Sequence, residues 1–163
     1  MTISKTDERP VPYSTTLLVR DTCVCLHVQR AARALARRFD AILAPHGVTN
    51  GQFSLLMSLN RPEPPGMGSV AALLAMDRTT LTAALKPLQR RGLVEVLIDP
   101  ADKRSRLLLL TPAGQEILAA ALPLWCEAHE RLERQMGPGV LDDLRAGAQQ
   151  HDPIAQGQGL LHL

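Results

Sequence analysis

Two short β-type runs around a charged turn are the feature that most constrains the fold of this chain. The runs are LVEVLI at residues 93–98 and RLLLLT at residues 106–111, and DPADKRS lies between them. Short apolar runs that flank a polar turn predict a β-hairpin. Helical patterns lie on both sides of it, so the sequence predicts a mainly α protein with one small hairpin (α+β).

The helix before this hairpin has well-defined ends. Asp77 is a capping residue ahead of RTTLTAALKPLQRR, and Gly92 is typical of the position that follows a helix. Leu81, Leu85 and Leu88 recur at helical spacing and are expected to face the core. A shorter helix, SVAALLAM, comes directly before it. Two helices followed by a hairpin predict a winged helix-turn-helix.

Long helical patterns flank this block. One helix is expected from about Leu17 to the break at APHGV, and a second, NGQFSLLMSLN, is expected to be capped by Thr49. Thr111 and Pro112 start a helix that ends at GPG, and VLDDLRAGAQQ is a last short helix. We therefore expect a single chain with four segments: a flexible arm (1–16), the first two helices (17–59), the winged helix-turn-helix (68–111), and C-terminal dimerisation helices with a tail (112–163).

Composition agrees with a helical protein and argues against several classes. Aromatic residues make up only 2% of the chain, so the core must be built from Leu, Ala, Val and Met. No apolar run reaches the roughly 18 residues of a membrane span, and the polar first residues lack the apolar centre of a signal peptide. We expect a cytoplasmic protein with no membrane partner. Catalytic, phosphate-loop and zinc spacings are not found, so we expect no enzyme, no cofactor and no metal.

The positions of the cations are more informative than the net charge of +2. The helix face opposite the three leucines has hydroxyl groups near its start and cations further on, as a helix in the DNA major groove requires. The hairpin turn adds cations that can reach phosphates or the minor groove. Solvated surface charge is the alternative for any single residue. The expected DNA contacts are Arg78, Thr79, Thr80, Thr82, Lys86, Arg90, Lys103, Arg104 and Arg106.

Asp102 lies beside the cations of the hairpin turn. A free carboxylate near DNA would repel the phosphates. We therefore expect Asp102 to pair with an arginine and to hold the turn in shape.

The central block resembles the MarR family of bacterial transcription regulators. DRTTLTAALKPLQRRGLV is similar to that family's recognition helix and GVTNGQFSLL to the start of its second helix. DPADKRSRLLLLTPAG is similar to its wing. The matching wing residues are Asp99, Asp102, Arg104, Leu110, Thr111 and Gly114. The resemblance covers about residues 20–145.

This resemblance implies a homodimer that binds double-stranded DNA, with Arg104 in the minor groove and the helix 78–91 in the major groove. It also implies a repressor that a small effector or oxidation releases. The long Ala- and Leu-rich helices support a dimer independently, because they exceed what one small winged helix can cover. A two-fold dimer would bind a pseudo-palindrome with half-sites about 10 bp apart. A winged-helix module for protein interaction, without a DNA role, is the alternative.

The run CVCLH raises the question of a metal or redox site. On one continuous helix, Cys23 and Cys25 point about 200° apart, so they share neither a metal nor a disulfide. Cys23 and His27 share a face, but two ligands are too few for a metal site. Packing as a small hydrophobic residue is the simplest interpretation for both cysteines.

Cys25 and its neighbours also offer a sensor. One MarR branch, the organic hydroperoxide regulators, has its reactive cysteine at the position that Cys25 matches. That branch supports the thiolate with two tyrosines, whereas Gln29 and Phe39 stand at the matching positions here. Oxidant sensing through Cys25 is therefore an alternative to a small-molecule effector. His27 and Arg30 could line a pocket for such an effector, with an aromatic anion as the expected ligand.

Overall fold

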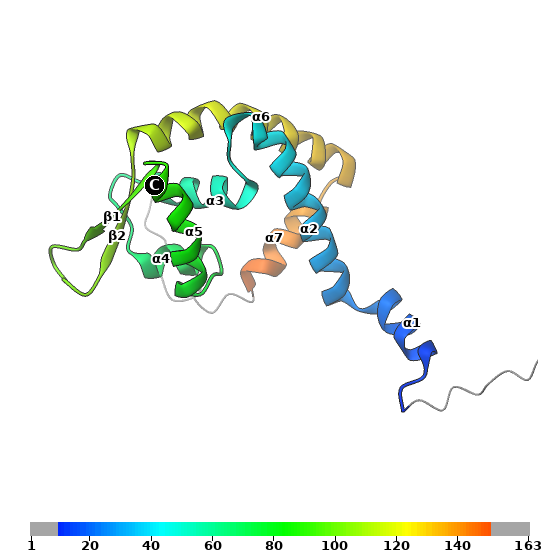
Figure 1. Ribbon diagram of the computed structural model, residues 1–163. Helices are drawn as coiled ribbons and strands as arrows, with labels where there is room; N and C mark the ends of the chain where they lie inside the picture. Colours follow the sequence, from blue (N-terminus) through cyan, green and yellow to red (C-terminus); the bar gives the residue numbers. More distant parts are fainter. Residues whose placement is uncertain (1–9, 151–163) are drawn as a thin grey trace, which may run out of the picture. The chain divides into compact units, whose positions relative to one another are not determined.

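Helices account for most of the described part of the chain, and one hairpin interrupts them there (Figure 1). The computed structural model describes residues 10–150. The elements are α1 (Tyr13–Thr22), α2 (Val24–Leu43), the 3-10 turn η1 (Ala44–His46), α3 (Asn50–Leu59), α4 (Met67–Leu73), α5 (Arg78–Arg90), β1 (Val94–Ile98), β2 (Arg106–Leu110), α6 (Pro112–Met136) and α7 (Val140–Gln150). The predicted fold class is confirmed. The chain divides into two units, Met1–Arg38 and Phe39–Leu163, which are described separately.

The N-terminal unit contains two helices where the sequence predicted one. The backbone of Cys23 is extended (φ −71°, ψ 104°), so α1 ends before it and α2 begins after it. Asp21 and Thr22 are weak helix formers, and the Thr22 hydroxyl donates to the Leu18 carbonyl at 2.7 Å. The Cys23 N–H donates to the Val19 carbonyl at 2.9 Å and satisfies one of the carbonyls left open by the end of α1. The expectation of one continuous helix through the cysteine run was wrong.

The expected N-terminal arm is shorter than predicted. α1 begins at Tyr13, four residues before the expected helix start, so residues 13–16 are helical. Residues 1–9 of the expected arm, and the tail from residue 151, lie outside the described part of the chain.

The second unit is built around aliphatic side chains, as the low aromatic content predicted. The predicted cap of α3 is present: the Thr49 hydroxyl accepts from the Gln52 N–H at 3.2 Å, and the Gln52 side chain accepts from the Thr49 N–H at 3.1 Å. α3 packs against α4, α6 and β2. The largest fully buried side chains of the core are Leu43, Leu55, Leu56, Val70, Leu81, Leu85, Leu88, Val94 and Leu108.

The hairpin has the predicted strands. β1 and β2 pair antiparallel, from Val94 opposite Leu110 to Ile98 opposite Arg106. The segment before α4 adds a short third pairing that the sequence did not indicate: the Leu108 N–H donates to the Pro65 carbonyl at 2.9 Å. β2 is thereby paired on both of its edges near its middle, and the hairpin is attached to the start of α4.

One small cluster joins α5, the hairpin and α6, and we call it the joint (Gly92, Leu93, Thr111 and Gly114). The Thr111 hydroxyl donates to the Gly92 carbonyl at 2.7 Å and accepts from the Gly114 N–H at 3.1 Å. The Thr111 N–H donates to the Leu93 carbonyl at 3.2 Å. A Cβ atom on Gly114 would lie 2.3 Å from that same carbonyl oxygen. The three elements therefore meet at a point with no space for a side chain.

Candidate nucleic-acid interface

α5 is fixed to the core by one face and exposes the other. Leu81, Leu85 and Leu88 are fully buried, as their spacing predicted. The remaining surface of the helix is largely exposed, and it carries Arg78, Thr79, Thr80, Thr82, Lys86 and Arg90. Pro87 lies within the helix without ending it. All six expected contacts on α5 are therefore accessible to a partner.

The N-terminus of α5 is capped by Asp77, as predicted. Its carboxylate accepts from the Thr80 N–H at 2.8 Å and from the Thr80 hydroxyl at 2.7 Å. These bonds, the hydroxyl first, hold the pKa of Asp77 below its ordinary value. The Thr82 hydroxyl donates to the Arg78 carbonyl at 2.7 Å. Both hydroxyl protons are thus used within the helix, and these two threonines can offer an outside partner only lone pairs and methyl groups.

The turn between the strands, the wing turn (residues 99–105), is held by its own aspartates. Asp102 accepts from the Arg104 N–H at 3.0 Å and from the Ser105 hydroxyl at 3.0 Å. The Arg104 N–H is the larger cause that lowers the pKa of the Asp102 carboxyl. Asp99 accepts from the Ala101 N–H at 2.8 Å in the same manner. We expected Asp102 to pair with an arginine side chain; its contacts are instead to the backbone and to a hydroxyl group.

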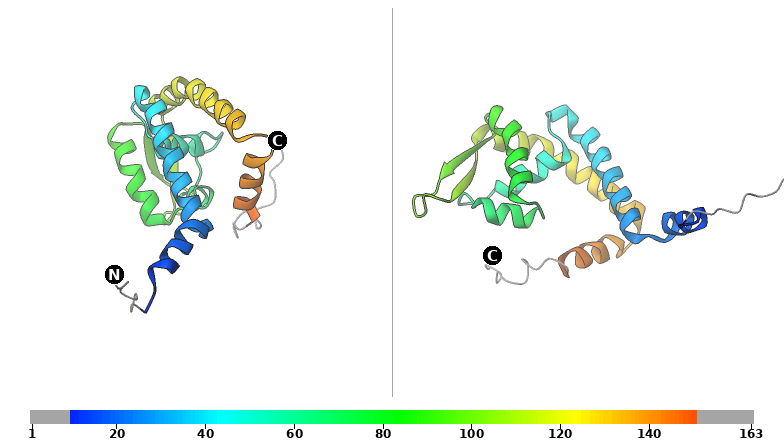
Figure 2. Two further views of the ribbon diagram at one scale, coloured as in Figure 1. Left: turned by 90° about the vertical axis from the view of Figure 1, so that its right-hand side faces the viewer. Right: turned by 60° about the horizontal axis from the view of Figure 1, so that its bottom comes forward.

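The three cations of the hairpin differ in their contacts. The Arg106 guanidinium donates to the carbonyls of Lys103 and Ser105 at 3.0 Å and 2.9 Å, so it is held against the backbone of the turn. Lys103 and Arg104 are exposed in the turn itself. Figures 1 and 2 show that the hairpin extends away from the helices of its unit and that the turn is its outermost part.

One residue that positions α5 was missed by the sequence analysis. The Arg91 guanidinium donates to the Gly47 carbonyl at 2.7 Å and ties the C-terminal end of α5 to the loop before α3. The two residues are 44 positions apart, so no local pattern could indicate the contact. Gly47 itself has a positive φ of 68°, which explains a glycine at this turn.

The three effector or sensor candidates lie on α2 in the N-terminal unit. Cys25 and Arg30 are exposed. The His27 Nε2 atom lies 3.3 Å from the Asp21 carbonyl oxygen, which links the start of α2 to the end of α1. In residues 10–150, no group of three or more His, Cys, Asp or Glu side chains is arranged to hold a metal ion. Within the same residues, no helix is long and apolar enough to cross a bilayer.

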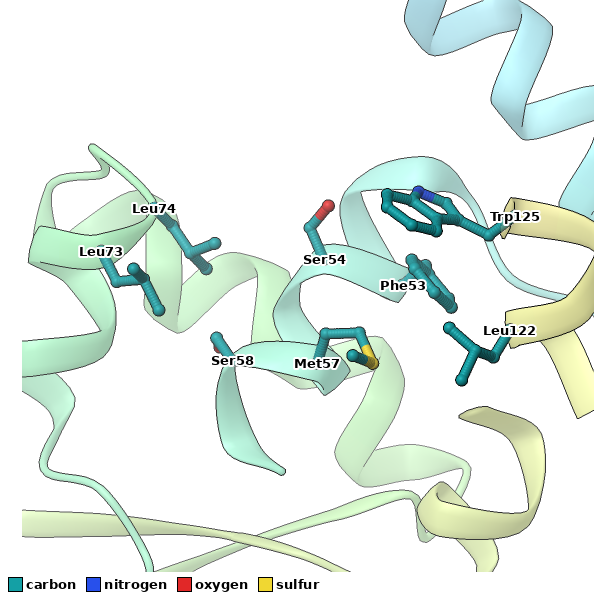
Figure 3. Close-up of a pocket in the computed structure, with 8 residues that line it drawn as sticks. All are labelled: Phe53, Ser54, Met57, Ser58, Leu73, Leu74, Leu122 and Trp125. Carbon is teal, nitrogen blue, oxygen red and sulfur yellow. The ribbon is translucent and has the colours of Figure 1, made fainter. Parts of the chain in front are cut away.

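A cavity of about 320 Å³ lies in the second unit between α3, α4 and α6 (Figure 3). Its lining comprises Phe53, Ser54, Met57 and Ser58 of α3, Leu73 of α4 with Leu74 directly after it, and Leu122 and Trp125 of α6. The Trp125 ring stacks on Phe53, with centroids 6.0 Å apart, and on His129, with centroids 4.6 Å apart. Cys25, His27 and Arg30, the residues expected to serve an effector, are not part of this lining.

These features define a class of protein. A short helix, a turn, a second helix that exposes hydroxyls and cations, and a basic hairpin form a winged helix-turn-helix. A family model described as "MarR family" matches residues 48–105, from the loop before α3 to the wing turn.

Two solved structures of transcriptional regulators are similar to this chain in sequence and fold. The chain is 33% identical to the transcriptional regulator MosR of M. tuberculosis, solved in complex with DNA, with a TM-score of 0.70 over 85% of this chain and 99% of that one. It is 30% identical to the transcriptional repressor CouR, solved on a 23-mer DNA duplex, with a TM-score of 0.64 over 81% of this chain and 92% of that one. The chain belongs to the MarR family, which confirms the resemblance found in the sequence.

Curated relatives match a shorter part. The transcriptional regulator HosA of Escherichia coli O111:H- is 39% identical over 79 residues, which are 47% of this chain and 57% of HosA. The chain spans about half the length of the curated relatives that it matches. What it binds is therefore argued from its own residues below.

Proposed function

We propose that this chain is a transcriptional regulator that binds double-stranded DNA, with α5 in the major groove and the wing turn at the minor groove. The observation that carries the proposal is that α5 and the hairpin both expose cations and are both fixed at the joint. α5 presents its cations on the face opposite three buried leucines, and the hairpin presents Lys103 and Arg104 at its tip. The DNA complexes of MosR and CouR, which are similar in fold and sequence, support it.

The proposed contacts divide by role. Arg104 enters the minor groove, where the negative potential is greatest, and Lys103 contacts phosphates. Lys86 and Arg90 contact phosphates beside the major groove, while Arg78, Thr79 and Thr82 face base edges. We expect smaller shares for Thr80 and Thr82, because their hydroxyl protons already serve Asp77 and the Arg78 carbonyl. Arg106 has a smaller share as well, because its Nη1 donates to the wing turn.

We further propose that the working form is a homodimer built by α1, α2, α6 and α7. On α1 and α2, four aliphatic side chains are more than half exposed: Leu18, Val19, Val24 and Val28. Exposed apolar surface of this kind is covered in a stable protein, and a second copy covers it symmetrically. The dimer would bind a pseudo-palindromic operator with half-sites about 10 bp apart.

The proposed mode of action is repression that an effector relieves. It requires no catalysis, and it places the chain in the cytoplasm, where bacterial DNA is found. Oxidation of Cys25 is a second way to release DNA, and its exposure is the observation that favours it. The test is peroxide treatment of the unmodified chain and of Cys25→Ser. If the variant loses operator binding on treatment just as the unmodified chain does, Cys25 has no part in the mechanism.

The test is operator binding by the full chain. Fluorescence anisotropy with the DNA upstream of the chain's own gene, at a stated salt concentration, should give saturable binding. A scrambled fragment of the same length is expected to bind at least about a thousandfold more weakly. Equal binding of both fragments would contradict sequence-specific regulation, and no binding to either would favour a protein-interaction module.

A further inference from the structure

We propose that His129 is a pH-sensitive switch that holds α7 against α6 at neutral pH and releases it in mild acid. Both helices belong to the second unit, and α7 lies below the C-terminal end of α6 in Figure 1. The switch itself does not depend on DNA binding. Its consequence for the operator, given last, rests on the proposed function.

One guanidinium of α7 joins the two helices. The Arg145 Nη2 atom lies 2.9 Å from the His129 Nε2 atom and donates to the Glu133 carboxylate at 2.9 Å. The Arg145 Nη1 atom donates to Asp142, on its own helix, at 2.7 Å. Nη2 carries two hydrogens, so it can serve both partners on α6 at once. Arg145 therefore bridges from α7 to two side chains that lie one turn apart on α6.

The contact with His129 requires a neutral imidazole. A guanidinium has donors and no acceptor, so the Nε2 atom must accept, and the ring proton must be on Nδ1. The Glu133 oxygen lies 3.6 Å from Nε2, too far for a hydrogen bond. The Glu133 carboxylate, and next that of Asp142, raise the pKa of Arg145 above its ordinary value, so the guanidinium stays charged. Histidine is the side chain of this cluster that changes charge between about pH 5 and 8.

Protonation of His129 turns an attraction into a repulsion. Nε2 takes a proton from solvent, and the new N–H then points at a second cation 2.9 Å away. His129 can donate this hydrogen to the Glu133 carboxylate, one turn along α6, as an i,i+4 ion pair. Arg145 then loses both partners on α6 and keeps Asp142, which belongs to its own helix. The side-chain bridge between the two helices is thereby broken.

The surroundings of His129 decide which side chain moves. The charged groups that face the imidazole are Glu133 of its own helix and Arg145 of α7. The Trp125 ring stacks on it with centroids 4.6 Å apart, and Phe39 at the end of α2 has its centroid 6.4 Å away. An aromatic face attracts a cation, so the rings retain the imidazolium and Arg145 is displaced. The histidine side chain is 29% exposed, which gives solvent protons access to it.

Amide hydrogen exchange of the full chain at about pH 8 and about pH 5.5 tests the switch, with rates corrected for the intrinsic effect of pH. We expect protection of the α7 amides to fall at least about tenfold at the lower pH, because hydrogen bonds to charged groups are lost. The amides of Thr80 and Arg104 are the internal reference. Their aspartate partners have lowered pKa values and stay ionised in this range. Unchanged α7 protection would overturn the proposal.

Two histidine variants form a matched pair. His129→Gln places a neutral acceptor beside Arg145 at both pH values, so α7 protection should not fall. His46→Gln removes a partly buried histidine of η1 and should retain the fall of the unmodified chain. A fall that persists in His129→Gln, or that disappears in His46→Gln, would overturn the assignment to His129.

Arg145→Gln tests the other side of the bridge, and it keeps the proposal testable if His129→Gln fails to fold by circular dichroism. Without the guanidinium, α7 protection should be low at both pH values. High protection that still falls in acid would overturn the bridge. Trp125, the chain's single tryptophan, reports the charge of His129 separately. Its fluorescence should change with pH in the unmodified chain and in Arg145→Gln, and a change that survives in His129→Gln would count against the switch.

Operator binding separates the switch from the proposed function. In the proposed homodimer α6 and α7 help to build the interface, so the release of α7 should lower operator affinity at about pH 5.5, and His129→Gln should prevent that loss. Release of α7 with unchanged operator affinity would overturn the regulatory consequence and retain the switch. A chain that binds no operator at either pH but releases α7 as expected would overturn the proposed function and leave the switch in place.

Discussion

α5 and the wing turn carry similar cations to the same proposed partner, but they are held in opposite ways. α5 is held by burial, through three leucines that solvent does not reach. The wing turn has no buried side chain, and its shape depends on the hydrogen bonds of Asp99 and Asp102. The comparison shows two ways of holding charge in place: burial of an apolar face in α5, and local hydrogen bonds in the wing turn.

The largest effect is expected from the buried side of α5. Leu85→Ala should reduce the free energy of unfolding by about 2–5 kcal/mol, because it leaves a cavity beneath the helix. Urea denaturation followed by circular dichroism measures the loss. Lys86→Ala, the next residue on the exposed face, is the control and should leave stability nearly unchanged. Equal stability of the two variants would contradict the anchored helix.

The wing turn should show the reverse pattern, with a large change in binding and little in stability. Arg104→Ala is expected to weaken operator binding by about 1–3 kcal/mol per half-site, because a minor-groove contact is lost. The dimer, measured by light scattering, should remain intact. Arg131→Ala removes an exposed arginine from α6 and serves as the control. Normal operator binding by Arg104→Ala would refute the wing assignment.

A smaller effect is expected from the cations of α5. Lys86→Ala should reduce the slope of log K against log salt by about 1 for each half-site, because one phosphate contact disappears. Gln89→Ala, an uncharged change on the same helix, should leave the slope as it was. A slope that Lys86→Ala does not alter would mean that this ammonium group is solvated in the complex.

The smallest effect concerns pH. The pKa values of Asp77 and Asp102 are lowered, so both carboxylates stabilise the folded chain above their ordinary pKa of about 3.9. This contribution is lost only as the pH falls through the lowered values. We expect no change between neutral pH and about pH 5, and loosening of the cap and the wing turn in stronger acid. The amide NMR signals of Thr80 and Arg104 report it; midpoints above the ordinary pKa would contradict the lowered values.

The parts of the fold that follow from local chemistry could be predicted from the sequence. The start of α5, the strand pair and the start of α6 each depend on neighbouring residues, namely Asp77 with Thr80, the turn around Asp102, and Thr111 with Pro112. Such caps and turns are encoded within about four positions. The family motif lies in the same block and also consists of neighbouring residues, so the sequence was enough to identify the kind of site.

The remaining features depend on contacts that sequence spacing does not express. The break at Cys23 has no glycine or proline to indicate it. The bond from Arg91 to Gly47 and the pairing of Leu108 with Pro65 join distant segments. Three helices supply the cavity, so its lining could not be recognised from one stretch. The backbone partner of Asp102 could have been predicted, since aspartate in a turn often accepts from the backbone N–H two residues on.

The joint at Gly114 has a consequence for how such a regulator can respond to a signal. α5, the hairpin and α6 meet where even a methyl group would collide with the Leu93 carbonyl, so they are expected to move as one body. In the proposed dimer, we therefore expect an effector to leave the shape of each DNA-reading half unchanged and to alter the distance between the two halves. The affinity for operators with one base pair added or removed between the half-sites would therefore report the distance between the two halves.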